Sequence, residues 1–127
     1  MKRAYLPPLL LLTATLLLSL WNSSYMARET ERWQSQVSRA GDLALAQQWP
    51  EAMEALEESY NDWQGRQTYL HIVLRHDTLD GAEAMYRRAA AFAATRESAE
   101  FQAEIENLRH QLALIAEMER LHINNVL

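Results

Sequence analysis

The chain has 127 residues, of which 49% are hydrophobic, with 17 acidic against 12 basic residues and no cysteine. This length allows one small domain and excludes a two-domain enzyme. Outside the first 21 residues there is a single proline, which together with only three glycines excludes sheet-and-turn architectures and glycine- or proline-rich disorder. The absence of cysteine excludes disulfides and thioether-linked lipid, so the domain folds by packing alone.

Charge divides unevenly along the chain. Lys2 and Arg3 are the only charged residues before residue 22, and the remainder carries 10 − 17 = −7. An acidic domain of this kind argues against nucleic acid as a partner.

An uncharged, leucine-rich segment spans residues 4–21. As a helix it would be about 27 Å long, just short of the roughly 30 Å hydrocarbon core of a bilayer. Tyr5 and Trp21 lie at its two ends, as interfacial aromatic residues do, and the basic pair before it keeps the N-terminus inside. The sequence therefore predicts a signal anchor or signal peptide over residues 1–25 and an extracytoplasmic helical bundle over residues 26–127.

The segment after the leucines decides between an anchor and a cleaved leader. It reads Asn-Ser-Ser-Tyr-Met-Ala over residues 22–27, and cleavage within it would put Tyr25 or Asn22 at the −3 position, where a small residue is needed. We therefore favour an uncleaved, single-pass anchor in the cell membrane, with the C-terminal domain outside the cytoplasm. A cleaved leader would make the protein secreted.

Apolar residues recur at helical spacing through the rest of the chain. Pro50 begins a second helix, expected over residues 50–76. Asp77, with Asp80 three residues later, mimics a capping box that opens a third helix near residue 78, and a polar link over 95–98 leads to a fourth. The expected apolar stripes are Trp33, Val37, Ala40 and Ala44; Met53, Leu56, Tyr60, Trp63, Leu70 and Leu74; Leu79, Ala82, Tyr86, Ala89 and Ala93; and Phe101, Ile105, Leu108, Leu112 and Ile115, the last stripe fading at Glu119.

Short links between such helices imply antiparallel neighbours. The predicted fold class is therefore all-α: an N-terminal signal-anchor helix followed by a bundle of about four helices arranged as two antiparallel hairpins.

Four carboxylates, Glu51, Glu54, Glu58 and Asp62, share one face of the second helix. They are consistent with a weak cation site or a dock for a basic partner. We favour a solvated face, because hard cations need oxygens that converge from several directions.

Ligand-type side chains concentrate at His71, His76, Asp77 and Asp80, the weak candidates for a metal site. Against that reading, the two aspartates have a capping role, and a histidine at a helix C-terminus is favoured there when protonated. We therefore prefer a structural explanation and expect no metal and no cofactor. His110 and His122 do not have zinc-ligand spacing.

No nucleophile elbow or phosphate loop is present, so the sequence predicts that the protein is not an enzyme. Among the tryptophans, Trp63 belongs to the core and Trp49 to the first link, which leaves Trp33, on the stalk, as the expected exposed contact. The candidate partner-binding residues are therefore Trp33, His76 and Asp80.

The chain resembles the bacterial domain-of-unknown-function family 4363 over nearly its whole length. The matching features, in order, are the N-terminal anchor, the run Trp49-Pro50-Glu51-Ala52-Met53-Glu54-Ala55-Leu56, Trp63, the junction His76-Asp77-Thr78-Leu79-Asp80, the leucine-rich last helix and the ending Asn125-Val126-Leu127. Leu79, where members tend to have isoleucine, and the alanine-rich third helix depart from the pattern. The resemblance implies an exported, anchored helical domain without a known activity. Genes of this family often lie beside one for a multi-pass membrane protein, so the resemblance suggests that protein as a partner.

The favoured function is a non-enzymatic domain that is anchored in the membrane through residues 4–21 and binds another protein; the family resemblance suggests a multi-pass membrane protein as this partner. One alternative is a small-ligand or metal-sensing domain that uses His71, His76, Asp77 and Asp80. Another is a peptide-binding module, since the first hairpin also resembles a single tetratricopeptide unit. A peptide groove between the two hairpins would show as an apolar concave surface.

Overall fold

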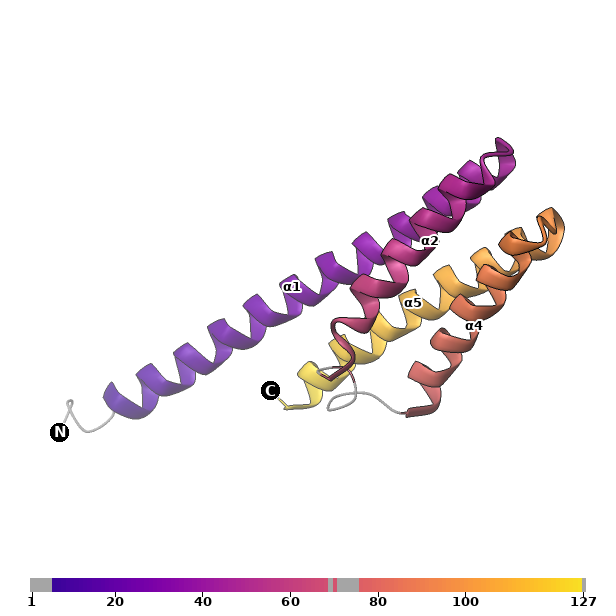
Figure 1. The fold of residues 1–127 in the computed structure, drawn as a ribbon. Coiled ribbons are helices and arrows are strands. Elements are labelled where there is room, and N and C mark those ends of the chain that lie inside the picture. Colours follow the sequence, from indigo (N-terminus) through magenta and orange to yellow (C-terminus); the bar gives the residue numbers. More distant parts are fainter. Residues whose placement is uncertain (1–5, 69, 71–75, 127) are drawn as a thin grey trace.

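The structure is a computed structural model that describes residues 6–68, 70 and 76–126 (Figure 1). Its long helices are α1 (Leu6–Leu45), α2 (Trp49–Gln64), α4 (His76–Ala94) and α5 (Ser98–Val126). Within these ranges there is no strand. The all-α prediction is confirmed.

The four helices form two antiparallel hairpins, α1–α2 and α4–α5, that lie side by side (Figure 1). Helix α1 packs against both α2 and α5, and α4 packs against α5, whereas α2 and α4 contact each other only sparsely. The bundle is therefore closed on three sides and loosely closed along the seam between α2 and α4.

Both hairpin turns end the preceding helix in the same way. Gln47 and Arg96 adopt left-handed backbone angles, with φ of 62° and 55°. In each turn the N–H of the following residue donates to a carbonyl five residues back, at 2.9 Å. This is the Schellman motif, which satisfies carbonyls at the helix end and which usually has glycine at the left-handed position.

Glycine at either left-handed position is expected to stabilise the protein. Q47G and R96G each remove a steric cost of about 1 kcal/mol that a side chain bears at positive φ. Each variant should raise the thermal unfolding midpoint followed by circular dichroism. A46G, one residue before the left-handed position, should lower it. A lower midpoint in Q47G and R96G would contradict this account of the turns.

The predicted apolar stripes form the core. All four stripe residues of α1, all five of α4 and all five of α5 are buried, as are Leu56, Trp63 and Leu70. Small residues let the two longest helices approach closely: Gly41 is buried, and its carbonyl accepts a 2.9 Å hydrogen bond from Gln102 Nε2 of α5. Met53 and Tyr60, expected in the core, are only partly buried.

Two predicted boundaries are wrong. The second helix does not run over residues 50–76, because α2 ends at Gln64 and the backbone turns at Gly65, a residue with weak helix preference. The next long helix begins at His76 instead of near residue 78, so Asp77 lies inside its first turn, where it accepts a 3.0 Å hydrogen bond from the Thr78 N–H. Residues 71–75, including Leu74, lie outside the described residues.

The N-terminal part of α1 projects beyond the bundle (Figure 1). Its leucines between Leu6 and Leu20 are 44% to 71% exposed. Among the residues that the structure describes, no helix meets the length and apolarity needed to cross a membrane. Lys2, Arg3 and Tyr5 of the predicted anchor lie outside the described residues.

Tyr25 marks the place where α1 enters the bundle. Its ring stacks on Trp21 with centroids 6.1 Å apart, and the Arg66 guanidinium lies 4.7 Å from the centre of the same ring. Arg66 also lies 3.8 Å from the Glu29 carboxylate. These contacts therefore join the base of the projecting arm, the part of α1 that lies beyond the bundle, to the turn that follows α2.

Candidate partner-binding cleft

The seam between α2 and α4 contains an open apolar cleft of about 260 Å³. It is lined by Leu56, Glu57 and Tyr60 of α2 and by Tyr86, Arg87 and Ala90 of α4. Ala90 supplies only a methyl group where a larger side chain would fill the space between the helices. The concave apolar surface expected for a groove between the hairpins is therefore present.

Buried hydrogen bonds fix the floor of the cleft. The hydroxyl groups of Tyr86 and Ser59 share a 2.8 Å hydrogen bond, and Ser59 Oγ donates to the Trp33 carbonyl at 3.1 Å. The Tyr60 and Tyr86 rings meet edge to face, with centroids 5.4 Å apart. Because these contacts join α1, α2 and α4, the floor is preformed.

Burial raises the pKa of the Tyr86 hydroxyl well above its ordinary value of about 10, and the negative charge of Asp62 adds to the rise. Above about pH 10 the unfolded chain therefore releases this proton while the folded chain keeps it, so stability falls as pH rises. At about pH 11 the free energy of unfolding is therefore lower by about 1.4 kcal/mol. Thermal midpoints measured from pH 9 to pH 11 should fall more steeply in the parent protein than in Y86F; equal slopes would contradict the assignment.

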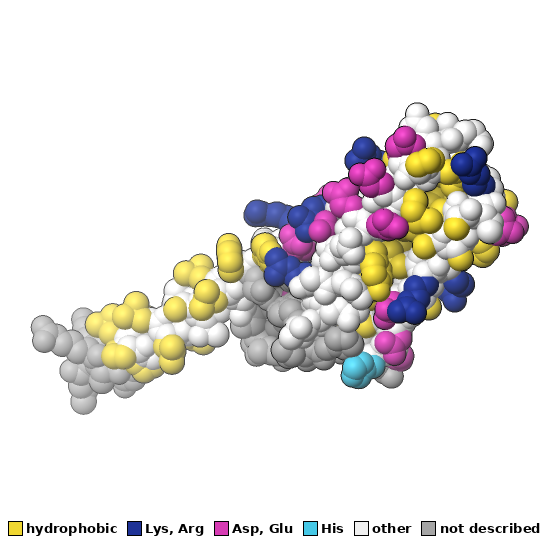
Figure 2. Space-filling view, viewed as in Figure 1, with side chains coloured by type: hydrophobic (Ala, Val, Ile, Leu, Met, Phe, Trp, Pro, Cys, Tyr) yellow, Lys and Arg dark blue, Asp and Glu magenta, His cyan; other side chains and the backbone are white. Residues whose placement is uncertain are grey.

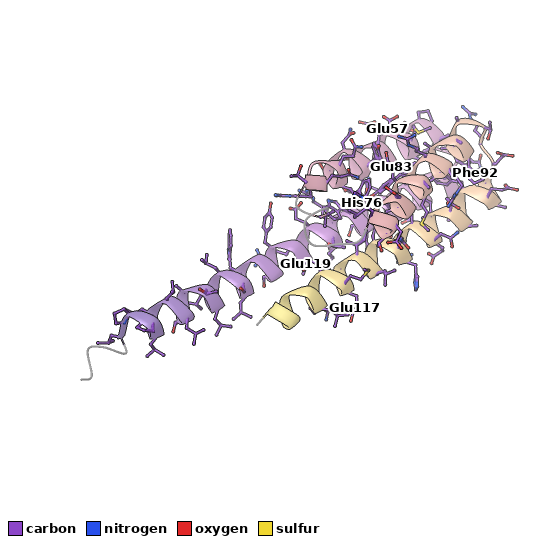
Figure 3. The ribbon with its side chains drawn as sticks, turned by 90° about the horizontal axis from the view of Figure 1, so that it is seen from below. Glu57, His76, Glu83, Phe92, Glu117 and Glu119 are labelled. Atoms are coloured by element: carbon purple, nitrogen blue, oxygen red, sulfur yellow. The ribbon has the colours of Figure 1, made fainter. Side chains whose placement is uncertain are left out.

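The two lips of the cleft differ in their charge pairing. On the α4 lip, Glu83 accepts hydrogen bonds from Tyr60 Oη at 3.1 Å and from Arg87 Nη2 at 3.0 Å. On the α2 lip, Glu57 is exposed and makes no ion pair among the described residues. Figure 3 shows Glu57 and Glu83 on neighbouring helices, far from Glu117 of α5.

The prediction that Trp33 is an exposed contact is wrong. Its side chain is 0% exposed, because the stalk helix enters the bundle before this residue. Trp33 lies beneath the cleft floor and supports it through the Ser59 hydrogen bond.

The predicted metal-type cluster is not assembled among the described residues. His76 and Asp80 are both exposed on α4, and no group of three or more His, Cys, Asp or Glu within the described ranges could hold a metal ion. His71 lies outside those ranges. His76 and Asp80 also do not line the apolar cleft.

The acidic face of α2 is largely solvated. Glu51, Glu54 and Glu58 are exposed, whereas Asp62 accepts a 2.8 Å hydrogen bond from Gln36 Nε2 and lies 3.7 Å from Arg32 Nη2. These carboxylates do not converge on a cation position. In Figure 2 acidic side chains gather over α2, along one side of a strip of apolar side chains.

A second hollow, of about 410 Å³, lies between α1 and α5 where the arm leaves the bundle. Leu20, Ser24 and Ala27 line it from α1, and Ala116, Glu119 and Arg120 from α5. Glu119, where the last apolar stripe was expected to fade, is buried, so the inward face of α5 continues with a carboxylate (Figure 3).

Residues 20–126 match the family model described as "Domain of unknown function (DUF4363)". The chain belongs to this family. No curated protein and no solved structure matches it. The matched range contains α2, α4, α5 and the part of α1 from residue 20 onward, so the DUF4363 domain includes the whole cleft.

None of the six cleft residues of this DUF4363 chain was predicted as a site residue: Leu56, Tyr60 and Tyr86 were expected only as members of apolar stripes, and Glu57, Arg87 and Ala90 lie outside those stripes. Glu57 lies one residue after the core residue Leu56, and Ala90 one residue after Ala89, so both border a buried stripe. Positions next to an apolar stripe can therefore be recognised in the sequence as candidates for a surface site. The sequence did not show, however, which pair of helices would pack loosely and leave such positions exposed.

Proposed function

We propose that this DUF4363 protein is a non-enzymatic, membrane-anchored, extracytoplasmic helical domain that binds another protein, with another membrane protein as its partner. The observation that carries the proposal is the apolar cleft between α2 and α4. Concave apolar sites with a few polar groups at their edges are where proteins most often bind partners or ligands.

The composition of the cleft supports protein binding. Tyrosine and arginine are, with tryptophan, the residue types enriched among energetically important contacts, and Tyr60, Tyr86 and Arg87 line this cleft. The tyrosine rings are already ordered by their ring contact and by the Ser59 hydrogen bond. A partner would therefore not bear the cost of ordering them.

The anchor part of the proposal rests on the leucines of α1. They surround the projecting helix and are exposed on all sides, a pattern suited to an apolar surrounding medium. Lys2 and Arg3 precede the segment and favour an N-terminus inside the cytoplasm. The bundle then lies outside.

Photo-crosslinking in native membranes tests the proposal. A benzoylphenylalanine replaces Arg87, at the cleft, or Arg109, its matched control on α5; each arginine is exposed and paired with a glutamate of its own helix. We expect a covalent adduct with another protein from position 87, several-fold above position 109. An absent adduct, or equal adducts at the two positions, would contradict cleft-mediated binding.

A further inference from the structure

The size of the cleft restricts its occupant. Pockets that hold free small molecules are about 300–1,000 Å³ and enclose most of the ligand. This cleft has about 260 Å³ and is open along the seam. It therefore suits a few large apolar side chains projecting from a partner surface better than a detached small molecule.

The backbone around the cleft restricts the occupant's conformation. Both walls are α-helices, whose interior N–H and C=O groups are bonded within each helix. An extended peptide would find no strand edge to pair with, and its own backbone groups would lose water without gaining partners. A helix satisfies its backbone internally and presents side chains at i, i+3 and i+4 along one face.

Charge restricts the occupant further. Helix α2 carries five acidic residues and no basic one, and Glu57 on the lip has no ion pair among the described residues. Arg87 on the opposite lip is already bonded to Glu83 at 3.0 Å. The field at the cleft therefore favours a cationic flank on the occupant.

A second copy of the chain fits less well. Two copies that met through this face would oppose one concave surface to another and leave a void between them, whereas stable interfaces pack as densely as protein interiors.

We propose that the cleft binds an amphipathic α-helix of the partner, whose apolar side chains enter between α2 and α4 and whose Lys or Arg side chains face Glu57. This inference rests on the proposed function and names the partner's chemistry. Tyr86 is joined through Ser59 to Trp33, so the cleft lies level with that residue of α1. Trp33 is twelve residues beyond Trp21, about 18 Å along the helix, so the partner's helix lies outside the bilayer.

The adduct formed from position 87 in the full chain provides the test. The crosslinked segment is sequenced by mass spectrometry, and the adduct yield is measured in E57K and in E58K. Glu58 is a matched control, because it is the adjacent residue of the same type but faces α1, 3.5 Å from Gln36 Nε2. We expect a segment with apolar residues at helical spacing and Lys or Arg on one flank, a roughly tenfold lower yield in E57K and little change in E58K. Reversing one of those basic residues to Glu should restore the yield in E57K.

A segment without Lys or Arg, an adduct with a second copy of this chain, or equal yields in E57K and E58K would overturn the inference. A crosslinked segment of another protein that lacks basic residues would contradict only this inference and would still agree with the proposed function. If no adduct forms from position 87, the result contradicts both this inference and the proposed function. Thermal unfolding of each variant shows whether the bundle is intact.

Discussion

Replacing Trp33 by alanine is expected to lower the free energy of unfolding by about 3–5 kcal/mol, the usual cost of removing a buried tryptophan. Its ring is fully buried where α1 meets α2. Small domains are stable by only about 5–15 kcal/mol, so this loss is a large share of the total, and the thermal transition of W33A should shift to a much lower temperature. The transition is followed by circular dichroism.

Two variants make this result specific. The indole Nε1 of Trp33 has no hydrogen-bond partner among the described residues, so W33F, which removes that group and keeps most of the packing, should lose much less stability than W33A. Trp21, 67% exposed on the projecting arm, should tolerate alanine with little change in the thermal midpoint. Equal midpoints in W33A and W21A would mean that Trp33 is not a core residue.

Placing two arginines in the projecting arm, L11R with L17R, is expected to remove the protein from the membrane fraction. Near the centre of a membrane-spanning helix each leucine-to-arginine change costs about 3 kcal/mol, so the pair costs about 6 kcal/mol. Both leucines are exposed and lie outside the bundle, so thermal unfolding of the bundle should not change. The measurement is the share of protein that stays in membranes after alkaline carbonate extraction.

Leu45 provides the matched control for this pair. It is 63% exposed, close to the 61% of Leu17, but it ends α1 at the far end of the bundle. L45R should stay in the membrane fraction. Retention of the L11R/L17R variant at the parent level would contradict the proposed anchor.

Most of the fold could be predicted because amphipathic helices place buried residues at regular intervals. Val37, Ala82 and Leu108 are buried as their stripes required. Pro50 correctly indicated the beginning of α2, since a helix tolerates proline well only in its first turn. The end of α2 was missed because apolar spacing continued past Gly65 in sequence, while the backbone turned there.

The candidate site was harder to predict because it depends on which helices pack together. Trp33 would lie on an apolar stripe whether it belonged to an exposed stalk or to the bundle. It is buried because α1 already packs against α2 and α5 at this residue. Likewise, Glu57 becomes notable only because α2 and α4 pack sparsely beside it. Tertiary packing of this kind leaves no local signature in a single sequence.

If the cleft between α2 and α4 holds a partner protein, that protein should remain bound when the complex is extracted from native membranes in mild detergent. Native mass spectrometry of the extracted complexes measures this. Three chains are compared: the parent, A90W, which fills the cleft with an indole, and A113W, which adds the same group to the exposed surface of α5. With thermal midpoints confirming folded bundles, we predict a stoichiometric second protein on the parent and on A113W and its loss from A90W. Equal occupancy on all three chains, or a second protein on none of them, would contradict the claim.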